Sequence, residues 1–182
     1  ASVGLVMGLV NGFIVTRFNV HSIIVTLGTL SLYRGLVFIV SEGRQIDRND
    51  IPEHVVAFSQ TSFLFSIPAI LIFSAIIVII THLVMRHSVL GREIYATGSN
   101  PVAAHLKGIN VTKVTLFCFG VCGMLAGVAG LFYASRFGYV NPGVTGVGIE
   151  FIVIAGVIIG GTSITGGSGS VLGTFLGILL LG

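Results

Sequence analysis

FLFSIPAILIFSAIIVIITHLVM, residues 63–85, is a stretch of the sequence without a single Asp, Glu, Lys or Arg. As a helix it would rise about 34 Å, which is enough to cross the roughly 30 Å hydrocarbon core of a bilayer. Residues 22–40 and 114–135 are apolar runs of similar length. Because backbone polar groups inside a bilayer must be satisfied within the spanning segment, these runs are expected to be helices. The sequence therefore predicts an all-α, polytopic transmembrane helical bundle.

The composition of the chain supports this interpretation. Hydrophobic residues make up 54% of the 182 residues and charged residues only 8%, whereas a soluble domain usually carries about 25% charged residues. The net charge of +3 is too small to indicate a nucleic-acid partner, and membrane lipid is the expected surrounding. We interpret residues 1–182 as part of a single transmembrane domain, with further helices expected beyond both ends.

Glycines recur at three- or four-residue spacing in several segments, a pattern that lets helix backbones approach closely. Gly4, Gly8 and Gly12 lie in the first apolar segment, residues 1–16. Further sets lie in the run 114–135 and near the C-terminus. The glycines of these two sets that are predicted to pack helices are Gly120, Gly123, Gly127, Gly169, Gly173 and Gly177.

The last part of the chain, residues 149–182, leaves two interpretations open. The segment 149–161 is short for a full span, and TSITGGSGS separates it from a second apolar run. Two short helices meeting at a glycine break and two separate spans both fit this pattern. Irregular backbone at membrane depth requires burial by protein or contact with water. The chain is accordingly expected to contain five or six spans.

The same segment nearly matches the phosphate-binding pattern GxxxxGK[ST], starting at Gly161. Gly167 stands where the pattern requires lysine, so the phosphates would lack their charge partner. The five His and two Cys, Cys118 and Cys122, form no group typical of a metal or catalytic site. We therefore expect this chain to bind no metal, nucleotide or other cofactor and to carry no catalytic residue.

Arg34 lies inside the apolar run 22–40. An arginine at membrane depth is costly and marks a candidate site on a substrate pathway. The alternative is that Arg34 lies near a helix end and extends its charged group to the lipid headgroups. The second interpretation is favoured because the polar residues that begin at Ser41 follow about two helical turns later.

A polar segment, residues 86–113, interrupts the apolar runs and carries both a helix start and a helix stop. Ser99 and Asn100 are good N-cap residues, and Pro101 follows at the favoured first helical position. Gly108 is a natural stop for a helix over Val102 to Lys107. So short a helix is not stable alone in water. It is either an amphipathic connector on the headgroups or a docking site for a cytosolic partner.

The distribution of basic residues favours a cytoplasmic location for this polar segment. Cytoplasmic loops carry an excess of Lys and Arg. With 86–113 inside, alternation also places 17–21 inside and places 41–62 and 136–148 outside. The inside loops then contain Arg17, Arg86, Arg92, Lys107 and Lys113, against Arg44, Arg48 and Arg136 outside.

Three stretches resemble the permease subunits of ribose-type ABC importers. GREIYATGSNPVAAHLKGIN (91–110) resembles their cytoplasmic loop, and residues 11–35 and 160–177 resemble further parts of these permeases in the same order. The resemblance implies that Asn100 to Gly108 is the coupling helix, which sits in a groove of the ATP-binding subunit. The residues expected to take part in this coupling are Gly91, Arg92, Asn100, Pro101, Ala103, Ala104, Leu106, Gly108 and Ile109.

The resemblance also implies a multi-pass protein of a bacterial inner membrane with about ten spans in the full chain. It implies cytosolic ATPase subunits that hold ATP and Mg²⁺, an extracytoplasmic binding protein and a second permease chain, identical or similar. The implied cargo is a monosaccharide or related polyol. TLGTLSLYRG and YATGSN are closer to permeases for autoinducer-2 or rhamnose than for ribose. The alternatives are a branched-chain amino-acid permease, a secondary carrier without an ATPase and a structural membrane scaffold.

Overall fold

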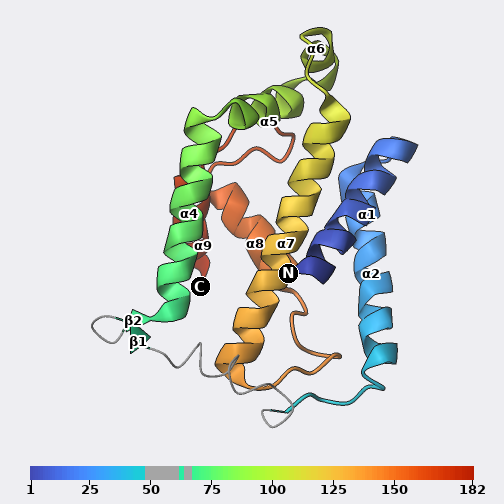
Figure 1. Ribbon diagram of the computed structural model, residues 1–182, viewed down its shortest axis with the longest axis vertical. Coiled ribbons are helices and arrows are strands. Elements are labelled where there is room, and N and C mark those ends of the chain that lie inside the picture. The colour runs from blue at the N-terminus through green and yellow to red at the C-terminus, as the bar shows by residue number, and fades with distance from the viewer. Residues whose placement is uncertain (48–61, 64–66) are drawn as a thin grey trace. The chain divides into compact units, whose positions relative to one another are not determined.

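The computed structural model describes residues 1–47, 62–63 and 67–182 (Figure 1). Most of the predicted polar loop 41–62 lies outside these residues. The elements in chain order are α1 (Ser2–Phe18), α2 (Ser22–Val40), β1 (Ser62–Phe63), β2 (Ile67–Pro68), α4 (Ala69–His87), α5 (Val89–Ser99), α6 (Pro101–Leu106), α7 (Val111–Phe137), α8 (Ile149–Ile159) and α9 (Val171–Leu181).

The helices confirm the predicted fold class. Among the described residues, α2, α4 and α7 are long and apolar enough to cross a membrane. Three further apolar helices, α1, α8 and α9, are shorter, so the expected five or six spans stay a prediction. The predicted run 22–40 coincides with α2, and α7 extends the predicted run 114–135 at both ends.

The start of the third predicted span was wrong. Helix α4 begins at Ala69 rather than at residue 63, and Pro68 pairs with Ser62 in a two-residue antiparallel ladder. Proline has no backbone N–H, and its ring disfavours a helical conformation in the residue before it. Ile67 is accordingly extended, and the helix starts only after the proline.

Contacts divide the chain into two compact units. Unit 1 comprises residues 1–71 and 115–145, and unit 2 comprises residues 72–114 and 146–182. Unit 1 contains α1, α2 and most of α7. Unit 2 contains most of α4, with α5, α6, α8 and α9.

In unit 1, glycines bring α1 and α7 into backbone contact. A Cβ added to Gly8 would overlap the carbonyl oxygen of Phe119, and one added to Gly123 would overlap that of Gly4. Gly127 lies against Ala1 and Gly4, whereas Gly120 faces the side chain of Leu9. The small-residue stripe predicted from the sequence therefore packs these two helices. The hydroxyl of Tyr33 on α2 also donates to the carbonyl oxygen of Met7 on α1, at 3.1 Å.

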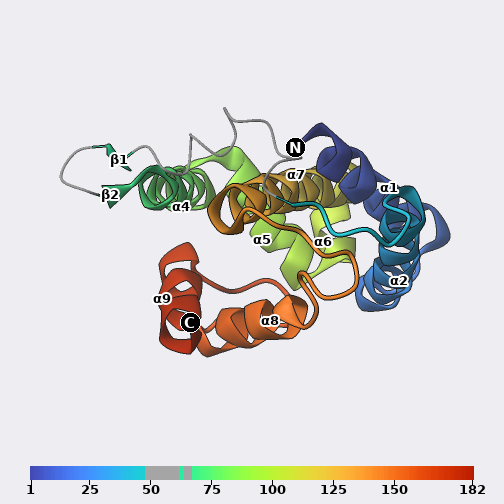
Figure 2. The same ribbon diagram turned by 90° about the horizontal axis from the view of Figure 1, so that it is seen from below.

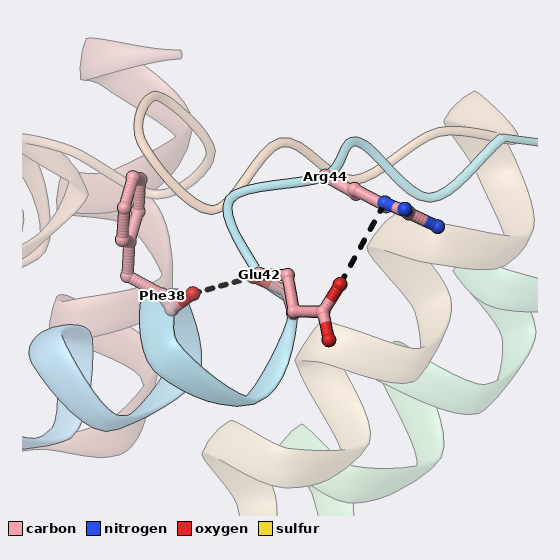
Figure 3. A network of polar contacts seen from close by, with 4 residues as sticks. Phe38, Glu42 and Arg44 are labelled. Carbon is pink, nitrogen blue, oxygen red and sulfur yellow. Dashed lines mark hydrogen bonds and ion pairs between the residues drawn. The ribbon is translucent and has the colours of Figure 1, made fainter.

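Helix α2 ends in a left-handed turn at Glu42, with φ 53° (Figure 3). The N–H of Gly43 donates to the carbonyl oxygen of Phe38 at 3.0 Å, and the N–H of Glu42 donates to that of Ile39 at 3.1 Å. This is the Schellman arrangement, in which glycine usually takes the left-handed position. The Glu42 carboxylate lies 3.9 Å from Nε of Arg44, and both side chains are exposed. A surface ion pair of this kind stabilises little.

In unit 2, α8 and α9 lie side by side (Figure 2). Gly160 meets Gly173, and Gly156 meets Gly177, so the order of contacts runs in opposite directions along the two helices. The structure thus shows two short helices that meet at the glycine-containing loop 160–170, which is the first of the two predicted arrangements. The close approach of Gly173 and Gly177 agrees with the predicted packing. Gly169 lies in the loop rather than on α9, and a Cβ there would meet the side chain of Thr162.

Candidate functional site

The polar segment begins with a helix that the sequence analysis missed. Helix α5 follows α4 after Ser88, whose Oγ accepts a hydrogen bond from the N–H of Gly91 at 3.0 Å (Figure 1). Gly91 is buried, and a Cβ there would overlap the carbonyl oxygen of Met85. The turn from α4 into α5 is this tight because residue 91 has no side chain. The N-cap signal at Ser88 could have revealed the helix.

Asn100 is the only residue between α5 and α6. Its N–H donates to the carbonyl oxygen of Ala96 at 3.1 Å, and its Oδ1 accepts from the N–H of Ala103 at 3.0 Å. Pro101 occupies the first helical position. Of the two predicted capping residues, Asn100 therefore caps α6, and Ser99 is the last residue of α5. One residue thus ends α5 with its backbone N–H and caps α6 with its side chain.

Helix α6 spans Pro101–Leu106, one residue earlier at each end than the predicted Val102 to Lys107. Gly108 follows its C-cap and stops the helix, as predicted. Gly108 has φ +84°, its N–H donates to the carbonyl oxygen of His105 at 2.9 Å, and the N–H of Ile109 donates to that of Ala104 at 3.1 Å. These bonds form a Schellman motif. Apart from the two chain neighbours of Gly108, no described residue has an atom within 4 Å of the place its Cβ would take. The glycine is therefore needed for its conformation alone.

The side chains of α6 divide between an exposed and a buried face. Val102 is 71% exposed and Leu106 is 83% exposed, whereas Ala104 is 3% exposed. Val102 and Leu106 are four residues apart and lie on the same side of the helix. His105 and Lys107 are also exposed. The structure thus leaves Leu106 available to a partner and buries Ala104.

The remaining residues predicted for coupling are placed along the same segment. Arg92 is exposed on α5, Ala103 is half-buried on α6, and Ile109 is half-buried after it. Nothing in the structure tests their contact with a partner, which stays a prediction.

Helix α5 contacts the glycine loop, by which we mean residues 160–170. The hydroxyl of Tyr95 donates to the carbonyl oxygen of Gly169 at 2.9 Å. A Cβ on Gly98 would lie 2.6 Å from the backbone nitrogen of Gly167, and one on Gly166 would lie 2.7 Å from the carbonyl oxygen of Gly98. The sequence analysis did not predict this contact, because it joins residues more than sixty positions apart.

Arg34 is half-buried on α2, six residues before the end of that helix, or about 9 Å along the axis. Its side chain makes no hydrogen bond or ion pair with any residue that the structure describes. A cavity of about 600 Å³ in unit 1 is lined by its neighbour Tyr33 but not by Arg34. Its role on a substrate pathway therefore stays a prediction.

In the part of the chain that the structure describes, three membrane-length helices, shorter apolar helices that pack through glycines, and a short capped helix on a polar segment define a polytopic membrane protein. Residues 1–182 match the family described as the permease component of the branched-chain amino acid transport system. The chain belongs to this family, and it is a multi-pass protein of the inner membrane.

Two relatives show the range of the match. The autoinducer 2 import system permease protein of Yersinia pseudotuberculosis is 36% identical over 179 residues, covering 98% of this chain and 50% of the relative. The ribose import permease protein of Haemophilus influenzae is 36% identical over 182 residues, covering 99% of this chain and 56% of the relative. The chain thus spans about half the length of these curated relatives. No solved structure matches it significantly. The predicted resemblance to ribose-type importer permeases is confirmed.

Proposed function

We propose that the chain is part of the membrane-spanning permease subunit of an ATP-binding cassette importer. Its cargo is a monosaccharide or related small polyol of the ribose, rhamnose or autoinducer-2 type. Support comes from the two relatives, which are import permeases for autoinducer 2 and ribose. Cargo crosses the membrane by alternating access between packed helices.

The observation that carries this proposal is the exposed apolar pair Val102 and Leu106 on α6. A six-residue helix does not persist in water by itself, yet caps at both ends hold this one in place. Apolar side chains four residues apart on one side of a helix are typical anchors for a partner groove. The partner we propose is the cytosolic ATPase subunit, since the flanking segment carries the basic residues expected of a cytoplasmic loop.

The other components follow from this assignment. The ATPase subunits hold ATP and Mg²⁺ and perform hydrolysis, while this chain performs no catalysis and binds no cofactor. An extracytoplasmic binding protein delivers the cargo, and a second permease chain, identical or similar, completes the pathway. These partners are proposals for the whole protein, because the chain spans about half the length of the curated relatives it matches.

The test replaces one apolar anchor in the full-length permease, expressed with its ATPase subunit. We expect Val102→Asp to reduce co-purification of the ATPase at least tenfold, because a charge would enter the desolvated contact. Val144→Asp is the matched control, since Val144 is also 71% exposed but lies on the loop after α7. The measurement is the ratio of ATPase to permease after purification in detergent. Equal ATPase recovery with both variants would contradict docking through α6.

A branched-chain amino acid is the second candidate cargo, favoured by the description of the family. Binding of ribose, autoinducer-2 or leucine to the partner binding protein separates these substrates. A secondary carrier is the alternative mechanism. Uptake driven by an ion gradient in proteoliposomes without ATP would favour that mechanism over the importer.

A further inference from the structure

The contact between α5 and the glycine loop lies within unit 2 and is reached from α6 through Asn100. Helix α5 is joined to α6 by Asn100, whose N–H donates to the carbonyl oxygen of Ala96 and whose Oδ1 accepts from the N–H of Ala103. Because no flexible linker separates them, a displacement of α6 must also move α5. The displacement of α6 is therefore passed to the residues that α5 contacts.

Two features join α5 to the glycine loop. The first is the hydrogen bond from the Tyr95 hydroxyl to the Gly169 carbonyl oxygen. The second is backbone packing, in which a Cβ on Gly167 would lie 2.7 Å from Cα of Ser99. Gly166 and Gly167 have φ +91° and +79°, a conformation that other residues rarely adopt. Glycines at these positions thus serve both the shape of the loop and its approach to α5.

The loop passes directly into helix α9. Gly169 precedes Ser170, whose Oγ caps α9 by accepting from the N–H of Gly173 at 3.0 Å. Thr162 and Thr174 share a hydroxyl hydrogen bond of 3.0 Å, so the start of the loop is also tied to α9. Helix α9 in turn packs on α8 through glycines. A movement of the Gly169 carbonyl is therefore a movement of the first turn of α9.

There is room for such a movement. A cavity of about 410 Å³ lies beside the contact, lined by side chains of α4 and α5, by the glycine loop and by the first turn of α9. Elements that transmit a displacement switch between two discrete arrangements. The loop therefore needs free space beside it for the second arrangement. The loop has few side chains to repack, because three of the four residues from Gly166 to Gly169 are glycines.

We propose that Tyr95 and Gly98 are positioning residues that pass the movement of α6 to the glycine loop and thus to α8 and α9. This inference rests on the proposed function, because α6 moves only if an ATPase subunit drives it. The path is α6, Asn100, α5, the glycine loop and α9. Its function is to link nucleotide-driven closure to the rearrangement of this helix pair.

The experiment uses the full-length permease with its ATPase subunit and binding protein in proteoliposomes. Tyr95→Phe removes the hydrogen bond and keeps the ring. We expect ATP hydrolysis within twofold of wild type and about a fivefold fall in cargo transported per ATP, the size of effect expected for one hydrogen bond. A role in stability alone would reduce hydrolysis and transport together.

Tyr33→Phe is the matched control, because the Tyr33 hydroxyl also donates to a backbone carbonyl oxygen, that of Met7 in unit 1. We expect this variant to keep the wild-type ratio of transport to hydrolysis. A normal ratio in Tyr95→Phe, or an equal fall in both variants, would overturn the inference.

Gly98→Ala provides a second test of the same path. A methyl group there must displace the loop backbone, so we expect a larger loss of coupling than in Tyr95→Phe. A wild-type complex without ATP-driven transport would overturn the proposed function and this inference together. Normal transport in wild type, Tyr95→Phe and Gly98→Ala would overturn the inference alone.

Discussion

Glycines bring backbones together in two regions of this protein, and they do so in different ways. In unit 1, Gly8 and Gly123 lie within two regular helices and provide only space. In unit 2, Gly166 and Gly167 lie in a loop and provide both space and a left-handed conformation. The first contact joins α1 and α7, which are regular helices with their own backbone hydrogen bonds. The second contact fixes a loop that depends on it.

The difference indicates what each contact is for. Helices packed through small residues gain dispersion energy over many atoms and have one favoured arrangement. A loop held to α5 by one side-chain hydrogen bond and a few backbone approaches can exchange one arrangement for another at small free-energy differences. We therefore expect substitutions in the α1–α7 contact to affect folding and substitutions in the α5–loop contact to affect coupling.

The largest expected effect is that of Gly123→Leu. The new side chain would overlap the backbone of α1, and overpacking of this kind costs about 1–3 kcal/mol or more. We expect most of the full-length protein to aggregate on detergent extraction, as measured by size-exclusion chromatography. Gly130→Leu on the same helix is the control, because none of the described atoms considered lies within 4 Å of a Gly130 Cβ. Similar elution profiles would show that the α1–α7 contact is dispensable for folding.

A smaller effect is expected for Gly167→Ala. The substitution adds a methyl group 2.7 Å from Cα of Ser99 at φ +79°, and the left-handed conformation alone costs about 1–2 kcal/mol. Gly108→Ala meets the same conformational penalty at φ +84° but has open space. The midpoint temperature of thermal unfolding in detergent should fall more for Gly167→Ala than for Gly108→Ala. If the two falls were equal, the glycine loop would not be packed tightly against α5.

The sequence allowed good prediction where the signal is local. The bounds of α2 follow from an apolar run that polar residues end on both sides, and the ends of α6 follow from Asn100, Pro101 and Gly108. Helix α5 was missed because its polar residues and two glycines resemble a loop. Its N-cap at Ser88 is a local signal, but its contact with the glycine loop joins distant residues and has no local pattern.

The faces of α6 show the same limit. In so short a helix, Ala104 and Leu106 can each occupy either a buried or an exposed position. A pattern of six residues does not predict which side of the helix other elements cover. The covering elements decide it, and they leave Leu106 exposed while Ala104 is buried. The boundary of α4 was missed for a related reason, since hydropathy counted residues 63–68 as helix although Pro68 favours extended backbone before it.

The smallest expected effect compares the two Schellman ends of the protein, one with Glu42 and one with Gly108 in the left-handed position. Glycine adopts this conformation without a Cβ clash, so Glu42→Gly should stabilise the end of α2 by about 0.5–1 kcal/mol. Thermal unfolding should shift upward by a few degrees at most. Arg44→Ala also removes the exposed ion pair of Glu42 but leaves the strained backbone, so it should leave the unfolding temperature unchanged. An upward shift in both variants would mean that the ion pair, which both substitutions remove, rather than the left-handed backbone, destabilises this helix end.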